Sequence, residues 1–540
     1  MDIRYTITVA GNAVSEKVAV REIKTCMGVN QISQLTLLIE DGDMAAESFF
    51  TTDADLFKMG KEIVVKAGIA EAQQQIIYIG VITEQSIGYD RATYLQVIAR
   101  GDVNKLCQAK LSKLYDPKTS DTDIITDLLS GAGASAGKIA KSEIKHHQFL
   151  MIEQSPWDML MHRALVNGFV LCDEGKADVV DLKKHQPGTH TFNLAMDGCI
   201  DFELSVDTSS HLKKTQYTGW DIKEQALLAN ADPLASSYKY PKHADADAAF
   251  SLPAQLCHAQ APVDKTELAA SATAEVNFRL LDMYQGRVRI DMSSKKALKG
   301  VKLLDALTVS GVGKLSAGEY LVGEIHHHIS DRGWYCEYVL GVPLTRTLWS
   351  PWQTLPPAAP VMAKVAAFQK DDEALQRIPV LLPTATNKKV VWARLLTPFA
   401  GKEEGVFLPP DLDTEVLVDF IGGDARYPVI IGACHNPKVM PPFAYDDKNE
   451  QRGIFFKEPA LAVQFTLKEP HLLLKGSKDQ TITFGQKQGY ALAQKDMATI
   501  TAKDTLNLMS KDKAMVDLSK DIHLKADGNA TIEAKATDVK

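Results

Sequence analysis

Residues 498–534 read ATITAKDTLNLMSKDKAMVDLSKDIHLKADGNATIEA and repeat a pattern with a period of eight residues. Within each repeat, three small or apolar side chains occupy alternate positions, which is typical of a short β-strand with one apolar face. Polar corners, such as those at 503–505 and 527–529, separate the strands and have the composition of turns. A repeat of this regularity predicts a repetitive β-structure rather than a set of unrelated strands.

A single ribbon of this kind has one thin apolar face, which it cannot bury by itself. The simplest solution is several identical ribbons around a shared axis with their apolar faces inward, and a three-sided prism is the smallest closed form. The alternative is a solvent-exposed β-solenoid formed by one chain. The side chains predicted to form the core of the prism are Ala498, Ile500, Leu506, Leu508, Ala514, Val516, Ile522, Leu524, Ala530 and Ile532.

The composition of the whole chain is that of an ordinary globular protein. Its 540 residues suffice for about two to four domains, and 45% of them are hydrophobic and 24% charged. The net charge of −8 is too small to indicate a nucleic-acid partner. Seven scattered cysteines without a CxxC pair indicate reduced thiols rather than a disulfide frame or a zinc site. Because no signal peptide and no long apolar run are recognisable, we expect assembly in the cytoplasm.

The region 1–345 contains many strand patterns and a helical middle. The best-defined helix begins after Ser155, a suitable N-cap, continues through Pro156 and Asp158, and ends at Gly168. Another helix, over 122–129, has an acidic first turn. Two β-rich units therefore flank a helical segment. Strands are predicted at 31–39, 77–83, 94–101, 287–290, 306–309, 320–325 and 334–340.

Prolines are concentrated in the region 346–364, which predicts a stiff, extended linker. The following region, 365–445, contains five short strand patterns, which suggest a small closed barrel of the OB type. Trp392, Phe399 and Phe407 lie in apolar contexts and are expected in the barrel core. The five strands are predicted at 379–382, 390–395, 405–409, 415–420 and 428–434.

Four motifs of this region follow one another in order: Trp-Ala-Arg at 392–394, Gly-Val-Phe-Leu-Pro at 405–409, Asp-Thr-Glu-Val-Leu-Val-Asp-Phe at 413–420 and Gly-Asp-Ala-Arg-Tyr-Pro at 423–428. With this order and spacing, the region resembles the OB domain of VgrG-type spike proteins of contractile injection systems. Those systems comprise type VI secretion, phage tails and extracellular phage-tail-like particles. The octad stretch resembles the trimeric β-prism needle of puncturing spikes, and parts of 1–345 resemble the hub of the same family.

The resemblance implies a mainly β protein with two tube-like β-barrel hub domains, a helical middle, an OB barrel and a C-terminal trimeric β-prism needle over 446–540. It also implies a homotrimeric, membrane-puncturing central spike, made in the bacterial cytoplasm, that caps a hexameric inner tube within a baseplate. Such a particle can be released from the cell. A small tip protein of PAAR type would cap the needle where the octad register ends, and the residues expected to dock it are Ala534, Asp538, Val539 and Lys540.

Few residues suggest a catalytic, metal or cofactor site. His326, His327 and His328 would alternate between the faces of a strand, so an exposed or interfacial strand is favoured over a metal site. The pair His146 and His147 is likewise expected in a loop or at a strand edge. Nucleophile and phosphate-loop motifs are absent from the sequence, so we expect neither an enzyme nor a cofactor. The alternatives are a tail-associated wall-degrading enzyme and an OB-fold protein that binds carbohydrate or nucleic acid.

Overall fold

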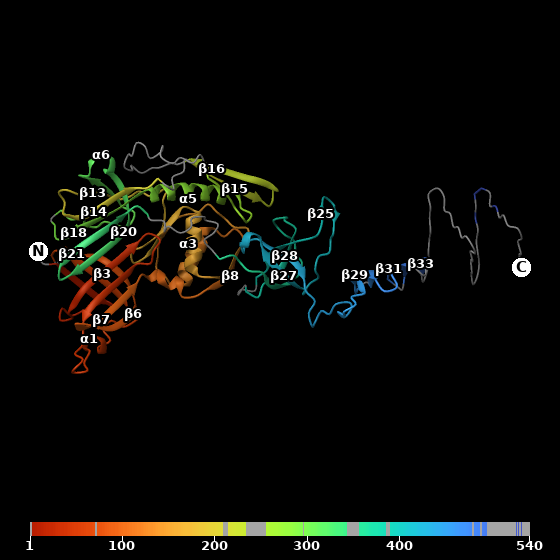
Figure 1. Ribbon diagram of the computed structural model, residues 1–540, viewed down its shortest axis with the longest axis horizontal. Coiled ribbons are helices and arrows are strands. Elements are labelled where there is room, and N and C mark those ends of the chain that lie inside the picture. The colour runs from red at the N-terminus through yellow and green to blue at the C-terminus, as the bar shows by residue number, and fades with distance from the viewer. Residues whose placement is uncertain are drawn as a thin grey trace. The chain divides into compact units, whose positions relative to one another are not determined.

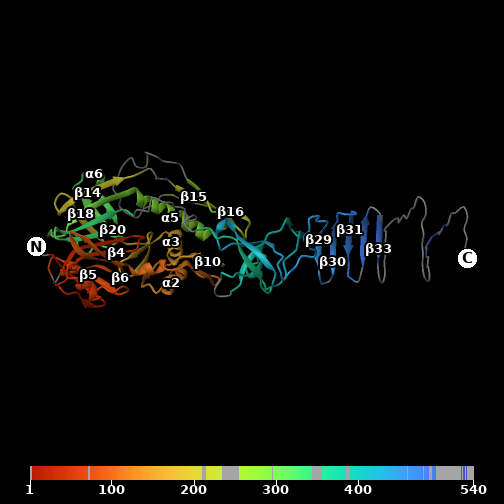
Figure 2. The same ribbon diagram turned by 60° about the horizontal axis from the view of Figure 1, so that its bottom comes forward.

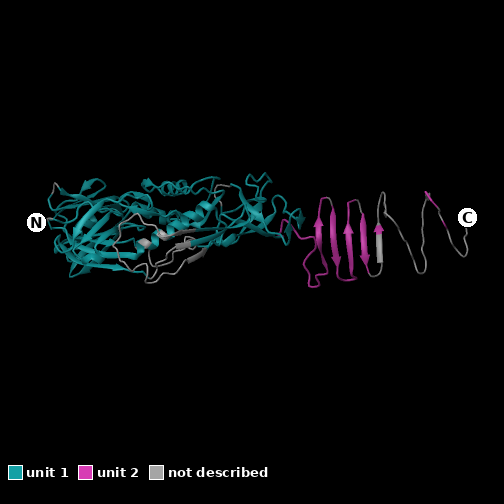
Figure 3. Cartoon of the chain, turned by 90° about the horizontal axis from the view of Figure 1, so that it is seen from above, with its two compact units in different colours: residues 1–434 teal, residues 435–540 magenta. Residues whose placement is uncertain are grey.

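Strands outnumber helices throughout the chain, as the alternating sequence patterns predict. The computed structural model describes residues 3–70, 73–208, 214–233, 255–294, 296–342, 356–384, 389–458, 460–477, 480–485 and 489–493, and beyond these only residues 525, 527, 528 and 531. The chain divides into two units, residues 1–434 and residues 435–540, which Figure 3 distinguishes by colour.

The first unit is built on a 13-stranded sheet with the strand order β14-β18-β21-β20-β3-β4-β7-β6-β5-β1-β2, to which β13 and β19 attach through β20. Alternate side chains of β4 and β7, including Leu37 and Val97, are fully buried on one face. The strands are β1 (Arg4–Val9), β2 (Asn12–Ala13), β3 (Val20–Gly28), β4 (Gln34–Glu40), β5 (Glu62–Gly68), β6 (Gln75–Asp90), β7 (Ala92–Arg100), β13 (Thr189–Asn193), β14 (Cys199–Val206), β18 (Tyr284–Asp291), β19 (Ala306–Ser310), β20 (Gly318–Ser330) and β21 (Gly333–Leu340).

The two β-rich parts of the first unit are joined by hydrogen bonds rather than separate. β20 pairs with β3 from Glu324 opposite Gly28 to Ser330 opposite Glu22, so strands from the beginning of the chain continue into strands from residues 284–340. Figure 1 shows this as red strands beside green ones. The predicted pair of tube-like hub barrels is therefore not shown in the described residues, where these strands belong to one sheet.

Three helices lie between this sheet and the barrel (Figures 1 and 2): α2 (Asp121–Gly131), α3 (Pro156–Val166) and α5 (Lys265–Met283). The predicted caps of α3 are present, since the Ser155 side chain accepts a hydrogen bond from the Asp158 N–H and Gly168 follows with a φ of +72°. Within the described residues, no helix is both long and apolar enough to cross a membrane. Smaller sheets are β8 (Leu111–Tyr115) with β10 (Phe149–Gln154); β9 (Ala136–Ile139), β11 (Phe169–Asp173) and β12 (Ala177–Asp181); and β15 (Lys214–Asp221), β16 (Ala226–Pro233) and β17 (Gln255–His258).

The predicted five-stranded barrel is confirmed, but one of its strands was assigned wrongly. The closed barrel consists of β22 (Val361–Val365), β23 (Arg377–Leu381), β24 (Val391–Leu395), β28 (Pro428–Ala433) and β27 (Glu415–Phe420). All but the last residue of the first strand fall inside the region predicted as linker, and its Ala363 and Val365 are buried.

The predicted strand at 405–409 does not form, apart from Gly405 at the end of β26 (Glu404–Gly405), which pairs with β25 (Ala400–Gly401). The apolar side chains of this stretch face solvent instead of the core, with Phe407 86% exposed. Phe399 is also exposed and Trp392 is half-buried, so the prediction that Phe399 and Phe407 belong to the core was wrong. Local alternation cannot distinguish a buried strand from an apolar loop.

The second unit contains an antiparallel five-stranded sheet (Figure 2) of β29 (Gln451–Phe456), β30 (Leu461–Thr466), β31 (His471–Lys475), β32 (Thr481–Gly485) and β33 (Gly489–Ala493). Its register aligns apolar residues in one row across all five strands. The members of this row are Ile454, Val463, Leu474, Ile482 and Leu492, each directly opposite the next.

A second row on the same face contains Phe465, Leu472 and Phe484. Ile454, Phe465 and Phe484 are 47%, 49% and 47% exposed, so this face is apolar and is left exposed by the residues that the structure describes. The predicted needle core, Ala498, Ile500, Leu506, Leu508, Ala514, Val516, Ile522, Leu524, Ala530 and Ile532, and the predicted docking residues, Ala534, Asp538, Val539 and Lys540, lie outside the described residues.

Candidate functional site at the helix–barrel junction

The hairpin between β27 and β28 carries an arginine into the helical layer. Gly422 and Gly423 have φ angles of +63° and +74°, which turn the chain sharply after β27. A side chain at Gly422 would collide with the backbone of Gln260, at 2.7 Å from its carbonyl carbon, so only glycine allows this close approach. Arg426, at the end of the hairpin, is thereby placed against the first turn of α5.

Arg426 and Arg163 hold one carboxylate between them. Arg426 Nη1 donates to both oxygens of Glu267 at 2.7 and 3.0 Å, and Arg163 Nη1 donates to Glu267 Oε1 at 2.9 Å. Arg426 also donates through Nη2 to Asp424 Oδ2 at 2.7 Å. Because Arg163 comes from α3, Glu267 from α5 and Arg426 from the barrel, this single carboxylate connects three elements.

Asp121 completes the network on the side of α2. Arg163 donates to its two oxygens through Nε and Nη2, both at 2.8 Å, in a bidentate pair. His146 Nε2 lies 2.7 Å from Asp121 Oδ1, and Asn167 donates to Oδ2 at 2.7 Å. Asp121 and Glu267 both lie in the first turn of a helix, where the helix dipole favours negative charge.

These ionised groups are almost completely removed from water. Arg163 and Asp121 are 0% exposed, Glu267 is 1% exposed and Arg426 is 7% exposed. Burial opposes ionisation most strongly, but Arg163 and His146 outweigh it and hold the pKa of Asp121 well below its ordinary value. In the same way, burial is outweighed by Arg426 and Arg163, which lower the pKa of Glu267 to about 2. The carboxylates of Asp121 and Glu267 are therefore ionised at neutral pH.

Further contacts attach the barrel beside this network. The Trp392 N–H donates to Gln148 Oε1 at 2.7 Å, and Leu114 and Leu150 of the β8–β10 pair belong to the same apolar cluster as the barrel core. His147 lies 3.0 Å from Glu373, and Lys389 is paired with Asp116. The helical layer and the barrel thus share both an apolar core and a buried network of charges.

The arrangement connects three elements through paired charges. Each charged group of the network is held by at least one partner of opposite charge, and no side chain in it is left to attack or protonate a substrate. Among the residues that the structure describes, no three His, Cys, Asp or Glu side chains gather as metal ligands. The described cysteines Cys26, Cys107, Cys172, Cys199, Cys336 and Cys434 are free thiols.

The three consecutive histidines alternate between faces, as predicted. His327 is buried and receives a hydrogen bond from Trp334 Nε1 at 3.4 Å, and burial lowers its pKa to about 4. His326 lies 2.8 Å from Glu324, whereas His328 lies 2.5 Å from Glu22. These histidines are therefore part of the sheet's own contacts, and each interacts with a different residue.

The buried network was not predicted from the sequence. His146 lies in a loop before β10, as expected, but its burial, with 5% of it exposed, and its contact with Asp121 were not predicted. One signal was present: Arg163 follows Met159 and Leu160 at helical spacing, on the apolar face of α3. A cation on such a face requires a buried anion, although its identity cannot be read locally.

We predict that Arg163→Met lowers the free energy of unfolding of residues 1–434 by about 3–5 kcal/mol, because it leaves Asp121 buried without its arginine and Glu267 with one arginine instead of two. The matched control is Lys113→Met, which breaks a 2.7 Å pair with Asp127 in which both side chains are 41% exposed. The control should cost less than about 1 kcal/mol. Calorimetric unfolding distinguishes the two, and equal losses would contradict the importance of the network.

A pH dependence follows from the depressed pKa of Glu267. Its ordinary value is 4.5, so the stability that it contributes is complete above pH 4.5 and is lost as the pH falls towards about 2. Glu267→Gln removes this contribution, so the variant should be less stable than the parent at neutral pH by about 3 kcal/mol. The difference between their melting temperatures should shrink between pH 4.5 and 2. A difference that stays constant over this range would refute the assignment.

Two family models match the chain. Residues 2–331 match the Alg8 N-terminal domain, and residues 361–435 match the type VI secretion system/phage-baseplate injector OB domain. The second match begins at the first residue of β22 and ends just after β28, so it coincides with the closed barrel. No curated protein sequence is significantly similar to the chain.

Solved structures share the fold at low sequence identity. Francisella VgrG, solved in a half-lidded PdpA–VgrG complex, is 10% identical with a TM-score of 0.59, over 91% of this chain and 88% of that chain. The E. coli c3393 protein is described as a component of the type VI secretion system, similar to the T4 bacteriophage tail proteins gp27 and gp5. It is 12% identical with a TM-score of 0.52, over 79% of this chain and 99% of that chain.

The resemblance inferred from the barrel motifs is thus confirmed at the level of the fold. Because the first family model spans more than half of the sequence, the chain belongs to the Alg8 N-terminal domain family, and it has the VgrG-like fold of type VI secretion and phage-baseplate spike proteins.

Proposed function

We propose that this protein is the central spike component of a contractile injection system and acts as a homotrimer. The VgrG-like fold and the match to the injector OB domain support a place in a baseplate. The observation that carries the trimer is the uncovered apolar face of the sheet β29–β33. Partners for this face are needed because monomeric proteins rarely leave a large contiguous apolar surface in water.

Association of three copies is the simplest way to cover the apolar face of the sheet β29–β33. One sheet has a single apolar face, and three such sheets can enclose a dry axis with their polar faces outward. The octads at 498–534 extend the same one-faced pattern along the sequence, which suits a prism that narrows to a needle. Fully burying a Val, Leu, Ile or Phe side chain contributes about 1.5–3 kcal/mol, so the rows of three copies supply a large driving force.

The proposed mechanism is mechanical. In a trimer, the region 1–345 serves as a hub on the inner tube, the barrel forms a collar and the C-terminal prism forms the point directed at a target membrane. Contraction of the sheath loads this assembly along its axis. The junction built around Glu267 suits such a load, because separating the barrel from the helices would expose an apolar core and unpair buried charges.

The alternatives have less support. A wall-degrading enzyme needs an unengaged acid, base or nucleophile, whereas the acids of the junction are held by arginines. Phe399 and Phe407 are exposed and could serve an OB protein as stacking platforms. However, Glu403 and Glu404 lie in the hairpin between them, and two carboxylates disfavour a phosphate backbone.

The trimer can be tested on the apolar row. In a trimer, Val463→Asp places three charges against the dry axis, and burying unpaired charges costs several kcal/mol each. The parent should therefore show the mass of three chains in native mass spectrometry, and the variant should shift to single chains. Thr483→Asp, on the opposite face of the same sheet, is the matched control and should remain trimeric. A Val463→Asp trimer of unchanged melting temperature would rule out the shared axis.

A tip protein is the second partner that we propose. The octad register stops near Ala534, so in three copies the strands of this region would offer β-edges and a small apolar patch. A small PAAR-type protein can pair with such edges by β-augmentation. Its co-purification should be lost when residues 531–540 are deleted, while the trimer persists. Equal recovery with the full-length and truncated proteins would exclude docking at this end.

A further inference from the structure

The connection between β24 and β27 of the barrel exposes a group of large apolar side chains. It spans residues 396–414 and contains the short β25–β26 hairpin, and Figure 1 shows β25 standing away from the barrel strands. Its large apolar side chains are all at least 39% exposed, and Phe407 reaches 86%. We refer to this set as the apolar arm. Its members are Leu396, Phe399, Val406, Phe407, Leu408 and Leu412.

The arm has a defined backbone, so its side chains are presented in fixed positions. The Val406 N–H donates a hydrogen bond to the Phe399 carbonyl oxygen at 3.0 Å, next to the paired strands of the hairpin. Gly405 has a φ of +137°, and a Cβ at this position would lie 2.6 Å from the same oxygen, so only glycine fits. Pro409 and Pro410 restrict the chain that follows. A fixed backbone lowers the entropy that is lost when such side chains bind a partner.

The outer wall of the barrel carries a second exposed apolar surface. Met362 of β22 lies directly opposite Leu417 of β27, and both point away from the core, because their neighbours Ala363 and Val416 are buried. Ile431 lies where the register between β27 and β28 is irregular. Met362 is 37% exposed and Ile431 is 43% exposed. We refer to Met362, Leu417 and Ile431 as the barrel wall.

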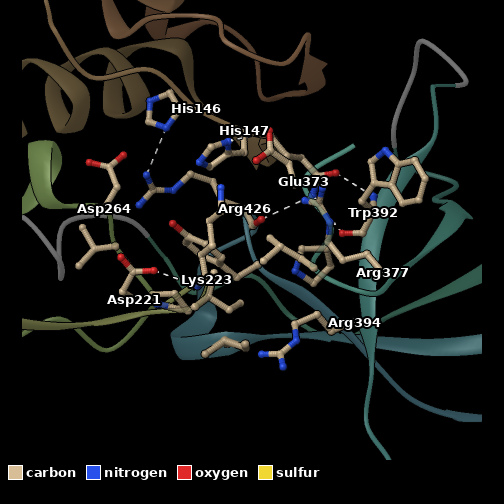
Figure 4. A pocket seen from close by; sticks show the side chains of 18 of the residues that line it. His146, His147, Asp221, Lys223, Asp264, Glu373, Arg377, Trp392, Arg394 and Arg426 are labelled. Carbon is tan, nitrogen blue, oxygen red and sulfur yellow. Dashed lines mark hydrogen bonds and ion pairs between the residues drawn. The ribbon is translucent and has the colours of Figure 1, made fainter. Parts of the chain in front are cut away.

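The region 1–345 covers a different part of the barrel. The Trp392 N–H of β24 donates to Gln148, and the guanidinium of Arg377 from β23 lies 5.7 Å from the centre of the Trp392 ring (Figure 4). His147 pairs with Glu373 beside them. These contacts leave the apolar arm and the barrel wall exposed among the residues that the structure describes.

A second copy of the chain offers a partner for each of the two surfaces. The arm protrudes and the wall is open, so copies can associate arm to wall in one direction, and such a head-to-tail contact closes into a ring when the rotation fits. The proposed trimer keeps three barrels close together, because only residues 434–450 connect β28 to the sheet β29–β33. A short tether raises the effective concentration to roughly millimolar, so a contact of modest affinity suffices.

We propose that, in the homotrimer, the apolar arm of each chain packs against the barrel wall of the next chain. Phe407 is the anchor of this contact, since a few aromatic side chains commonly carry most of the binding energy of an interface. The contact joins the three barrels into a ring through residues that differ from the apolar rows of the sheet β29–β33. The inference rests on the proposed trimer and assigns it a second interface.

The test replaces Phe407 of the full-length protein with the photoreactive residue p-benzoylphenylalanine. After irradiation, denaturing electrophoresis should show covalent dimers and trimers. Their yield should persist on dilution of about tenfold, because the contact is internal to the trimer. Mass spectrometry should map the crosslinks to peptides that contain Met362, Leu417 or Ile431. The matched control carries the same photoreactive residue in place of Phe50, which is 84% exposed in the region 1–345, and should give no crosslink to the barrel wall.

A change in the barrel wall should remove the same crosslink. Met362→Asp places a charge where the anchor packs, so the yield of crosslinked chains from position 407 should fall by at least about fivefold. Met196→Asp, at a methionine that is 71% exposed in the region 1–345, should leave this yield unchanged. Native mass spectrometry should show three chains for both variants, because the sheet β29–β33 is unaltered.

The possible outcomes separate this contact from the proposed trimer itself. Trimers without interchain crosslinks from position 407, or with crosslinks away from the barrel wall, would overturn the arm-to-wall contact and leave the proposed trimer in place. Equal yields from the Met362→Asp and Met196→Asp variants would show that the wall does not receive the arm. A parent protein that consists of single chains in native mass spectrometry would overturn both the trimer and the contact.

Discussion

The carboxylate of Glu267, held between two buried arginines, constrains much of the first unit. Neither Arg163 nor Arg426 can be buried without an anion, and Glu267 serves both. The positions of α3, α5 and the β27–β28 hairpin are thereby fixed relative to one another to within hydrogen-bond distances. Asp121 extends this constraint to α2 and His146. A barrel with a small core of its own is thus joined to a much larger sheet through charges that resist separation.

This arrangement suits a protein whose proposed work is to transmit force. Apolar contacts alone allow elements to slide, because they have little directional preference. Bidentate ion pairs fix both distance and orientation. The second unit differs, since one face of the sheet β29–β33 is apolar and exposed among the residues that the structure describes. In the proposed trimer, further copies of the chain would cover this face of the second unit.

The sequence predicted correctly those helix ends and strands that depend on residues close together in the chain. The caps of α3, the strand β21 and the span of β27 all follow from neighbouring residues, and each was predicted. The errors arose where burial depends on distant segments. Phe407 lies in an apolar run but faces solvent, while Val361–Val365 follows prolines but forms the first strand of the barrel. His146 and Asp121 are 25 residues apart, so their contact cannot be recognised from the residues that neighbour either of them in the sequence.

The claim that the barrel is joined to the helices through Glu267 and Arg426 can be tested most directly with a double-mutant cycle. The free energy of unfolding of residues 1–434 would be measured in the full-length parent, in Glu267→Gln, in Arg426→Met and in the double variant. The account predicts a coupling energy above about 1.5 kcal/mol, because either single change leaves the other charge buried with one partner fewer. Effects that add to within about 0.5 kcal/mol would show that the two residues act independently and would contradict the account.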